Sequence, residues 1–172
     1  GNIVLTAKWT PCDYSITYNN TKGAINHNAT GFNTDSATII LLDLQKEGYT
    51  FDGWYNNGIK VTQIPKGTIG NVDLTAKWTP ITYSATFVAE GEIVATRYFT
   101  IEDSVLDNIP NVPSKAGYTG AWQSYTITAN NITIYADYTL NEYTITYSNT
   151  KGAENFNPTN YAITTTTFEL LD

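Results

Sequence analysis

The decapeptide NVDLTAKWTP occupies residues 71–80, and NIVLTAKWTP, identical to it at eight of ten positions, occupies residues 2–11. The two copies begin 69 residues apart. In each copy apolar and polar residues alternate, which is the period-2 pattern of a strand with one buried face. Because self-similarity at a fixed distance is the signature of repeat architectures, this stretch predicts a chain of tandem β-rich repeats.

Other segments return at regular distances as well. YSITYNNTKGA at residues 14–24 returns as YTITYSNTKGA at residues 143–153, an offset of 129 residues. A more diverged copy, YSATF, lies at residues 83–87. GYTFDGW at residues 48–54 is answered by GYTGAW at residues 117–122, which is one residue shorter. The repeats are therefore of two types, a longer type A and a shorter type B.

These copies divide the chain into four segments. Residues 1–11 are interpreted as the closing strand of a preceding repeat, and residues 12–80 as a complete type A repeat. Residues 81–140 form a type B repeat, and residues 141–172 the first half of a further type A repeat. The return at 129 residues predicts an alternating array that continues beyond both ends.

Each repeat is expected to consist mainly of strands, so the fold class is mainly β, α+β at most. Alternation predicts strands at residues 14–18, 51–55 and 72–78. The apolar run at 38–44 contains Ile-Ile after Asp-Ser, which favours a strand over a helix. Proline and glycine at 61–70 predict a loop or one short helical turn.

A repeat of this size buries only a modest core, so large aromatic side chains are expected to supply much of its packing. These are the aromatic residues that recur at fixed places in the repeats. The predicted core residues are Tyr14, Tyr18, Tyr49, Phe51, Trp54 and Trp78 in type A, with Tyr118 and Trp122 in type B.

The composition excludes several classes of function. Charged residues make up 15% of the 172 residues, against roughly 25% in typical soluble domains. The net charge is −7 and no basic stripe exists, which argues against nucleic-acid binding. No apolar run approaches the roughly 20 residues of a membrane span, so direct insertion into a membrane is not expected. Thirteen Tyr and a surplus of Thr and Asn are typical of an exposed extracellular β protein.

GYTFDGWY at residues 48–55, followed by LTAKW at residues 74–78, resembles the Listeria–Bacteroides repeat, the B-repeat of internalin-type bacterial surface proteins. The resemblance implies an elongated array of small β-grasp-like sheets, each with a short helix or turn. It also implies a place on the bacterial exterior, in adhesins and stalks, and it brings no catalytic residues. Type B departs from the pattern, because Asp137 and Tyr138 stand where type A has Lys and Trp.

No catalytic, cofactor-binding or metal-binding residue is predicted. His27 is the only histidine, and its copy in the next type A repeat is Phe156, which favours a surface residue over a catalytic base. A zinc site needs three or four ligands, which one Cys and one His do not supply. Cys12 is interpreted as a linker residue, with an intermolecular disulfide as the alternative. The remaining carboxylates lack the spacing of a calcium loop and are interpreted as turn and surface residues; those weighed are Asp35, Asp43, Asp52, Asp103 and Asp107.

Two less common kinds of chemistry are weighed against simpler interpretations. Lys8 and Lys77 recur in the closing strand and could form an isopeptide bond, but they alternate with the inward residues and should face solvent. Gly53-Trp54-Tyr55 could form a sugar-binding platform. The recurrence of Trp54 as Trp122 favours a core position instead.

The sequence therefore predicts a non-catalytic structural and adhesive repeat array, extracellular, on a bacterial cell surface or secreted. An extracellular filament assembled by strand pairing between chains is the alternative, and a carbohydrate-binding module is a third. The expected partners are neighbouring repeats, other copies of this chain, and ligands on host or matrix surfaces. Strand pairing between copies would join residues 1–11 of one chain to residues 141–172 of another. The alternatives are that the chain is part of a longer continuous array, or that residues 141–172 pack onto the type B repeat.

Overall fold

The computed structural model describes residues 1–167 and 169–171 of the chain. Within them it contains thirteen strands and no helix, so the prediction of a mainly β fold is confirmed. The strands are β1 (Asp13–Asn19), β2 (Gly31–Asn33), β3 (Ile39–Ile40), β4 (Tyr49–Asn56), β5 (Ile59–Val61), β6 (Gln63–Ile64), β7 (Val72–Pro80), β8 (Tyr83–Ala89), β9 (Glu92–Phe99), β10 (Tyr118–Trp122), β11 (Ile132–Leu140), β12 (Glu142–Thr144) and β13 (Asn160–Ala162).

The chain divides into two compact units. Unit 1 comprises Gly1–Ile81 together with Thr100–Glu102. Unit 2 comprises Thr82–Phe99 and Asp103–Asp172. Unit 1 thus takes in a three-residue segment that the sequence places inside the type B repeat. The repeat boundaries drawn from the sequence stay a prediction.

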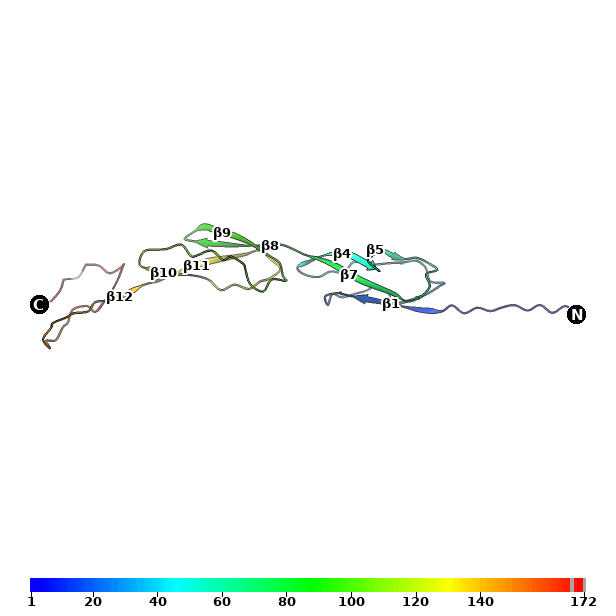
Figure 1. Ribbon diagram of the computed structural model, residues 1–172, viewed down its shortest axis with the longest axis horizontal. Helices are drawn as coiled ribbons and strands as arrows, with labels where there is room; N and C mark the ends of the chain where they lie inside the picture. The colour runs from blue at the N-terminus through cyan, green and yellow to red at the C-terminus, as the bar shows by residue number, and fades with distance from the viewer. Residues whose placement is uncertain (168, 172) are drawn as a thin grey trace. The chain divides into compact units, whose positions relative to one another are not determined.

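Unit 1 is built on a five-stranded sheet with the order β2-β1-β7-β4-β5. The first strand, β1, and the last, β7, are neighbours in the middle of the sheet and run parallel (Figure 1). Ile16 lies opposite Val72 and Tyr18 opposite Leu74. All the other pairings in this sheet are antiparallel.

One face of this sheet forms the core of unit 1. Val72, Leu74 and Ala76 alternate with exposed residues along β7, and all three are buried. Apolar residues from the neighbouring strands and loops complete the cluster. They are Ile16, Phe32, Leu41, Leu44, Trp54 and Ile64.

A β-bulge in β4 decides which side chains reach this core. Phe51 pairs with Trp78 and Gly53 with Lys77, so Asp52 is the extra residue on its strand. Phe51 and Trp54 are three residues apart and would face opposite sides of a regular strand. The extra residue brings both rings to the core side. Gly53 adopts φ +121°, a conformation that L side chains rarely take.

Unit 2 repeats the same plan with fewer strands. Its main sheet has the order β10-β11-β8-β9. The first strand of the sheet, β8, again runs parallel to β11, and Phe87 lies opposite Ile134 in the register of Tyr18 and Leu74. The core contains Ala85, Phe87, Phe99, Leu106 and Ile134. The strands β12 and β13 form a separate two-stranded ladder in this unit.

The structure differs from the sequence prediction in two segments. Of the strand expected at 38–44, only Ile39–Ile40 pairs, with β6. The segment 61–70 contains no helical turn: it holds β6 and a turn in which the Thr68 N–H donates to the Pro65 carbonyl. Residues 1–12 have no regular secondary structure and are exposed, so their role as a closing strand stays a prediction.

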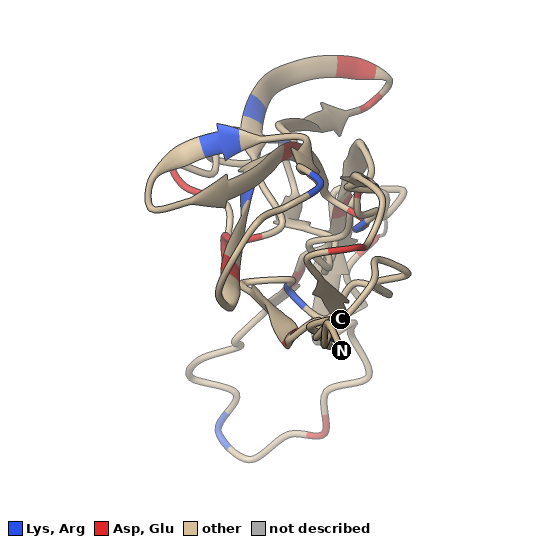
Figure 2. Ribbon diagram, turned by 90° about the vertical axis from the view of Figure 1, so that its right-hand side faces the viewer, with Lys and Arg blue, Asp and Glu red and all other residues tan. Residues whose placement is uncertain are grey.

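Charged residues are spread thinly along the strands and loops rather than gathered in a stripe (Figure 2). Among the described residues, no helix is long and apolar enough to span a membrane.

Candidate functional site

The aromatic residues of unit 1 form a continuous series of ring contacts, here called the aromatic column. Tyr18 contacts Trp54 with ring centroids 4.8 Å apart, and Trp54 contacts Phe51 at 5.5 Å. Phe51 contacts Trp78 at 4.9 Å, and Trp78 contacts Tyr49 at 6.3 Å. All four pairs are edge-to-face, the geometry that aromatic quadrupoles favour, and each such pair contributes about 0.5–1.5 kcal/mol beyond burial.

The eight predicted core residues differ in burial. Trp54 is 1% exposed, and the others are half-buried. Tyr14 stands apart from the column and contacts Phe32 with centroids 5.6 Å apart. Because Trp54 is enclosed, its face is closed to a sugar ring, and the Gly53–Tyr55 platform weighed from the sequence does not form.

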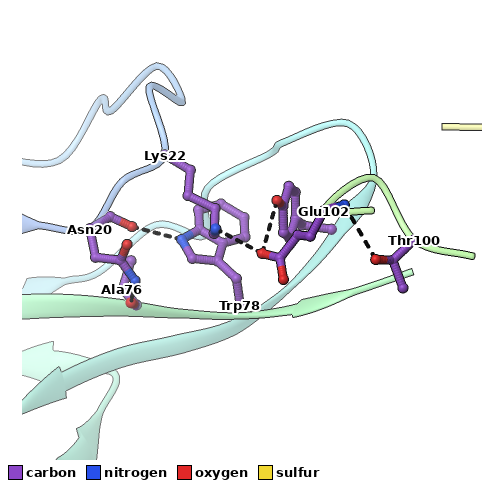
Figure 3. Close-up of polar contacts among 7 residues, drawn as sticks. Asn20, Lys22, Ala76, Trp78, Thr100 and Glu102 are labelled. Atoms are coloured by element: carbon purple, nitrogen blue, oxygen red, sulfur yellow. Dashed lines mark hydrogen bonds and ion pairs between the residues drawn. The ribbon is translucent and has the colours of Figure 1, made fainter. Parts of the chain in front are cut away.

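Each indole N–H in the column donates to a backbone carbonyl. Trp54 Nε1 lies 2.9 Å from the Leu42 oxygen, and Trp78 Nε1 lies 2.8 Å from the Asn20 oxygen. The Asn20 side-chain amide in turn donates to the Ala76 carbonyl at 2.9 Å (Figure 3). These bonds explain why a tryptophan can sit at the core, since a buried N–H without a partner is costly.

Unit 2 contains a shorter version of the same arrangement. Phe87 contacts Trp122 with centroids 5.0 Å apart, and Trp122 Nε1 donates to the Pro110 carbonyl at 2.7 Å. The acceptor precedes the tryptophan by twelve residues, as Leu42 precedes Trp54. Tyr118 lies under the Lys115 ammonium, 4.9 Å from its ring centroid.

Sequence reasoning missed Asn28, the buried polar residue of unit 1, which is 8% exposed. Its side chain accepts from the Leu42 N–H at 2.6 Å and donates to the Leu42 carbonyl at 3.0 Å. Asn157 makes the same pair of bonds with Leu171, at 2.6 and 3.1 Å. The Asn-x-Asn at 26–28 and 155–157 was the available signal, because it recurs while the residue between changes.

Tyr18 closes the other end of the column. Its hydroxyl donates to the Ala29 carbonyl at 2.7 Å, and the copy Tyr147 donates to the Pro158 carbonyl at 2.9 Å. Burial raises the pKa of Tyr18 from its usual 10.0 to about 12, because the phenolate would lose solvation. The neutral phenol is therefore the form that the fold requires.

Two lysines lie against tyrosine rings. Lys22 Nζ is 4.5 Å from the Tyr49 ring centroid and 3.1 Å from Glu102 Oε1. In unit 2, Lys115 Nζ lies 2.6 Å from Glu90 Oε1. The hydrogen bond to the partner carboxylate raises the pKa of each lysine, partly offset by desolvation. These are surface contacts that position loops, and neither lysine is set up as a proton acceptor.

The side chains weighed for reactive chemistry are exposed or engaged in surface contacts. His27 and Cys12 are both exposed. Lys77 Nζ lies over the Tyr55 ring, 4.0 Å from its centroid, and Asp52 accepts from the Thr79 hydroxyl at 2.8 Å. Among the described residues, no group of three or more His, Cys, Asp or Glu side chains could hold a metal ion.

The aromatic column, apart from Trp78, lies within a segment that matches a known family. The family model of the Listeria–Bacteroides repeat domain matches residues 14–77, from the second residue of β1 to the sixth residue of β7. This segment is a Listeria–Bacteroides repeat. The resemblance seen in the sequence is thus confirmed.

A curated relative supports the same family. Internalin H of Listeria monocytogenes is 34% identical over 114 residues, which cover 56% of this chain and 20% of internalin H. The chain therefore spans about a fifth of the length of this relative. No solved structure matches significantly.

Proposed function

We propose that this chain is a non-catalytic structural segment of a bacterial cell-surface or secreted protein, in which each repeat acts as a load-bearing spacer of a stalk. The Listeria–Bacteroides repeat at residues 14–77 and the similarity to internalin H support a place outside the cell. Because internalin H is much longer than the aligned segment, the stalk role rests on the geometry of the repeats.

The sheet order supports a β-grasp-like assignment for each repeat. In unit 1 the strand order has a parallel pair of first and last strands at its centre. The loop between β2 and β4 covers the face on which a β-grasp fold carries a helix, and it contributes the buried Leu41 and Leu44. A loop thus takes the place of the expected helix.

The parallel pairing of first and last strands is the observation that carries the stalk proposal. A pull along the chain enters unit 1 at Asp13 and leaves it at Pro80, at opposite ends of the β1–β7 pair. Such a pull slides the two strands along each other and loads all their hydrogen bonds together. The β8–β11 pair in unit 2 has the same arrangement. A repeat loaded in this way resists stretching better than one whose bonds open singly.

Single-molecule pulling on the full chain tests this proposal, with the exposed Cys12 as one attachment point. A second cysteine introduced as Ile81→Cys loads β1 and β7 in shear. The matched control, Asn33→Cys, opens the antiparallel β1–β2 pair from the end where Asp13 faces Asn33. We expect unit 1 to unfold at clearly higher force in the shear geometry. Equal forces in both geometries would refute the load-bearing role.

A weak adhesive role is proposed alongside. The outward residues of β7 are exposed, among them Thr75 and Thr79, and offer hydroxyl groups to a host or matrix surface. Solid-phase binding of the full chain to matrix proteins tests this. We expect weak binding that Thr75→Val reduces, and binding unaffected by this change would argue against the role of this face.

Assembly into a filament is a second candidate, favoured by one observation. Leu5 and Trp9 are 91% and 89% exposed, whereas Leu74, the copy of Leu5, is fully buried in β7. Residues 2–11 of one chain could therefore pair with residues 143–147 of another as β7 pairs with β1. Light scattering on chains lacking residues 1–11 tests this: assembly unchanged by the deletion, or a full chain that stays monomeric at high concentration, would refute it.

A further inference from the structure

The segment Thr100–Glu102 contributes to unit 1 although it follows β9 in the chain. The Ile101 side chain lies on Gly48, and a Cβ added to Gly48 would come within 2.9 Å of Ile101 Cγ2. Gly48 has φ +79°, and its carbonyl accepts from the Ile81 N–H at 2.9 Å. The bare Cα of this glycine is thus covered by an isoleucine.

The next residue adds polar contacts. Glu102 Oε1 accepts from Lys22 Nζ and from the Tyr49 hydroxyl, both at 3.1 Å (Figure 3). The side chains of Lys22 and Glu102 are 30% and 50% exposed, so their ion pair alone contributes little stability. The two bonds tie the segment to Lys22 and to the Tyr49 hydroxyl.

The apolar part of this arrangement occurs a second time, within unit 2. Gly117 has φ +76°, and a Cβ added there would come within 2.6 Å of Ile163 Cγ2. The Gly117 carbonyl accepts from the Asn141 N–H at 2.8 Å, as Gly48 accepts from Ile81. Both glycines open a Gly-Tyr-Thr sequence. Both isoleucines closely follow the second strand of the following repeat: Ile101 lies two residues beyond β9, and Ile163 one residue beyond β13.

The polar part differs between the two places. Lys115 pairs with Glu90 inside the type B repeat, and the residue after Ile163 is Thr164. In type A, Lys22 pairs with the residue that follows Ile101. The residue after the isoleucine is therefore acidic where it pairs with a lysine of the glycine's repeat, and neutral where the lysine beside the glycine pairs within its own repeat.

We propose that each Gly-Tyr-Thr turn is a socket for an isoleucine strap supplied by the next repeat in the chain. The type A socket takes Ile-Glu, and the type B socket takes Ile-Thr. The strap raises the stability of the repeat that it covers, so neighbouring repeats are coupled in folding. This inference concerns pairing between repeats and holds whether or not the array bears load.

Amide hydrogen exchange on the full chain tests the strap. Ile101→Ala should speed exchange of the Tyr49 and Ile81 amides in unit 1 by roughly 5- to 30-fold, the factor that a modest loss of packing produces. Ile93→Ala is the matched control, because Ile93 is a 68% exposed residue of β9. It should leave both amides unchanged. Faster exchange confined to β8 and β9 in the Ile101→Ala chain would overturn the proposal.

A charge swap tests the matching. Glu102→Lys and Lys22→Glu should each speed exchange of the Tyr49 amide about two- to fivefold, as expected for loss of an exposed ion pair. The double variant should recover most of that loss. Additive losses in the double variant would overturn the charge matching. If the Ile101→Ala chain fails to fold, the Glu102→Lys and Lys22→Glu variants still test the proposal, because they leave Ile101 in place.

Discussion

The strand β4 of type A and the strand β10 of type B differ in length, but each pairs with the closing strand of its repeat and carries a tryptophan. In β4, Phe51 pairs with Trp78, and the bulge residue Asp52 separates it from Gly53. In β10, Gly120 pairs with Tyr138, and the next residue continues the ladder without a bulge. Both strands still place a tryptophan opposite an alanine of the closing strand.

The difference shows how the repeat conserves the direction of one side chain rather than a sequence. Trp54 needs the bulge to point inward beside Phe51, whereas Trp122 follows Gly120 by two residues and points inward by simple alternation. In type B the room left by Gly120 is filled by Val112 and Tyr138, whose atoms would lie 2.6 and 2.9 Å from an added Cβ. Type B lacks a counterpart of Phe51, and its series of ring contacts is shorter, from Phe87 to Trp122.

The two tryptophans give the largest expected contrast. Trp54→Ala should lower the free energy of unfolding of unit 1 by about 3–5 kcal/mol, because Trp54 is 1% exposed and leaves a large cavity. Trp122→Ala should lower that of unit 2 by less, because Trp122 is half-buried. Denaturant unfolding monitored by amide hydrogen exchange measures the stability of each unit separately. Trp9→Ala, at an 89% exposed position, is the control and should change little. A loss below about 1 kcal/mol for Trp54→Ala would contradict the column.

A smaller effect is expected at the glycine that distinguishes type B. Gly120→Ala should destabilise unit 2 by about 1–3 kcal/mol, because the new methyl group meets Val112 Cγ1 at 2.6 Å. Adding Val112→Ala removes that atom, and the double variant should lose less than the sum of the two single losses. Thermal melts of the three variants provide the measurement. If the two single losses in stability simply add in the double variant, the close approach at Gly120 is not the cause of the destabilisation.

The smallest effect concerns Tyr18, which type B replaces by Phe87. Tyr18→Phe should cost about 0.5–1.5 kcal/mol at neutral pH through loss of the hydroxyl bond. Since the folded pKa is about 12 against 10.0 for an ordinary tyrosine, the contribution of Tyr18 is present below pH 10 and is lost between pH 10 and 12. The gap between wild type and Tyr18→Phe should therefore narrow over that range.

Absorbance at alkaline pH provides an independent measurement of Tyr18. In a titration of the folded chain, the Tyr18→Phe variant should lack one tyrosine ionisation near pH 12. Loss of a signal near pH 10 instead would show that the Tyr18 hydroxyl is not shielded from water.

The strands were predictable where apolar and polar residues alternate clearly. They were less predictable where side chains, rather than a neighbouring strand, form hydrogen bonds with the backbone. The pattern at 14–18 and 72–78 was enough to predict β1 and β7, because one face of each is buried. The strand expected at 38–44 shrinks to Ile39–Ile40, since the backbone of Leu42 is bonded by the Asn28 side chain and the Trp54 indole. A single sequence gives no sign that an asparagine will occupy those backbone groups.

The recurring aromatic residues were a sound guide to the packing, but not to its details. Which ring is fully enclosed depends on the bulge at Asp52, and the sequence signals it only as a one-residue length difference between two diverged copies. The contacts of Glu102 and Ile101 join segments more than fifty residues apart. Periodicity within a strand carries no information on such contacts.

The bulge in β4 also bears on how a gene for such repeats can change. A single codon gained or lost in a strand normally turns every later side chain to the opposite face and ruins the core. At Asp52 the extra residue leaves the ladder and the faces on both sides stay as they were. We therefore expect loss of the Asp52 codon, as recombination between unequal copies could produce, to leave both faces of the strand in place.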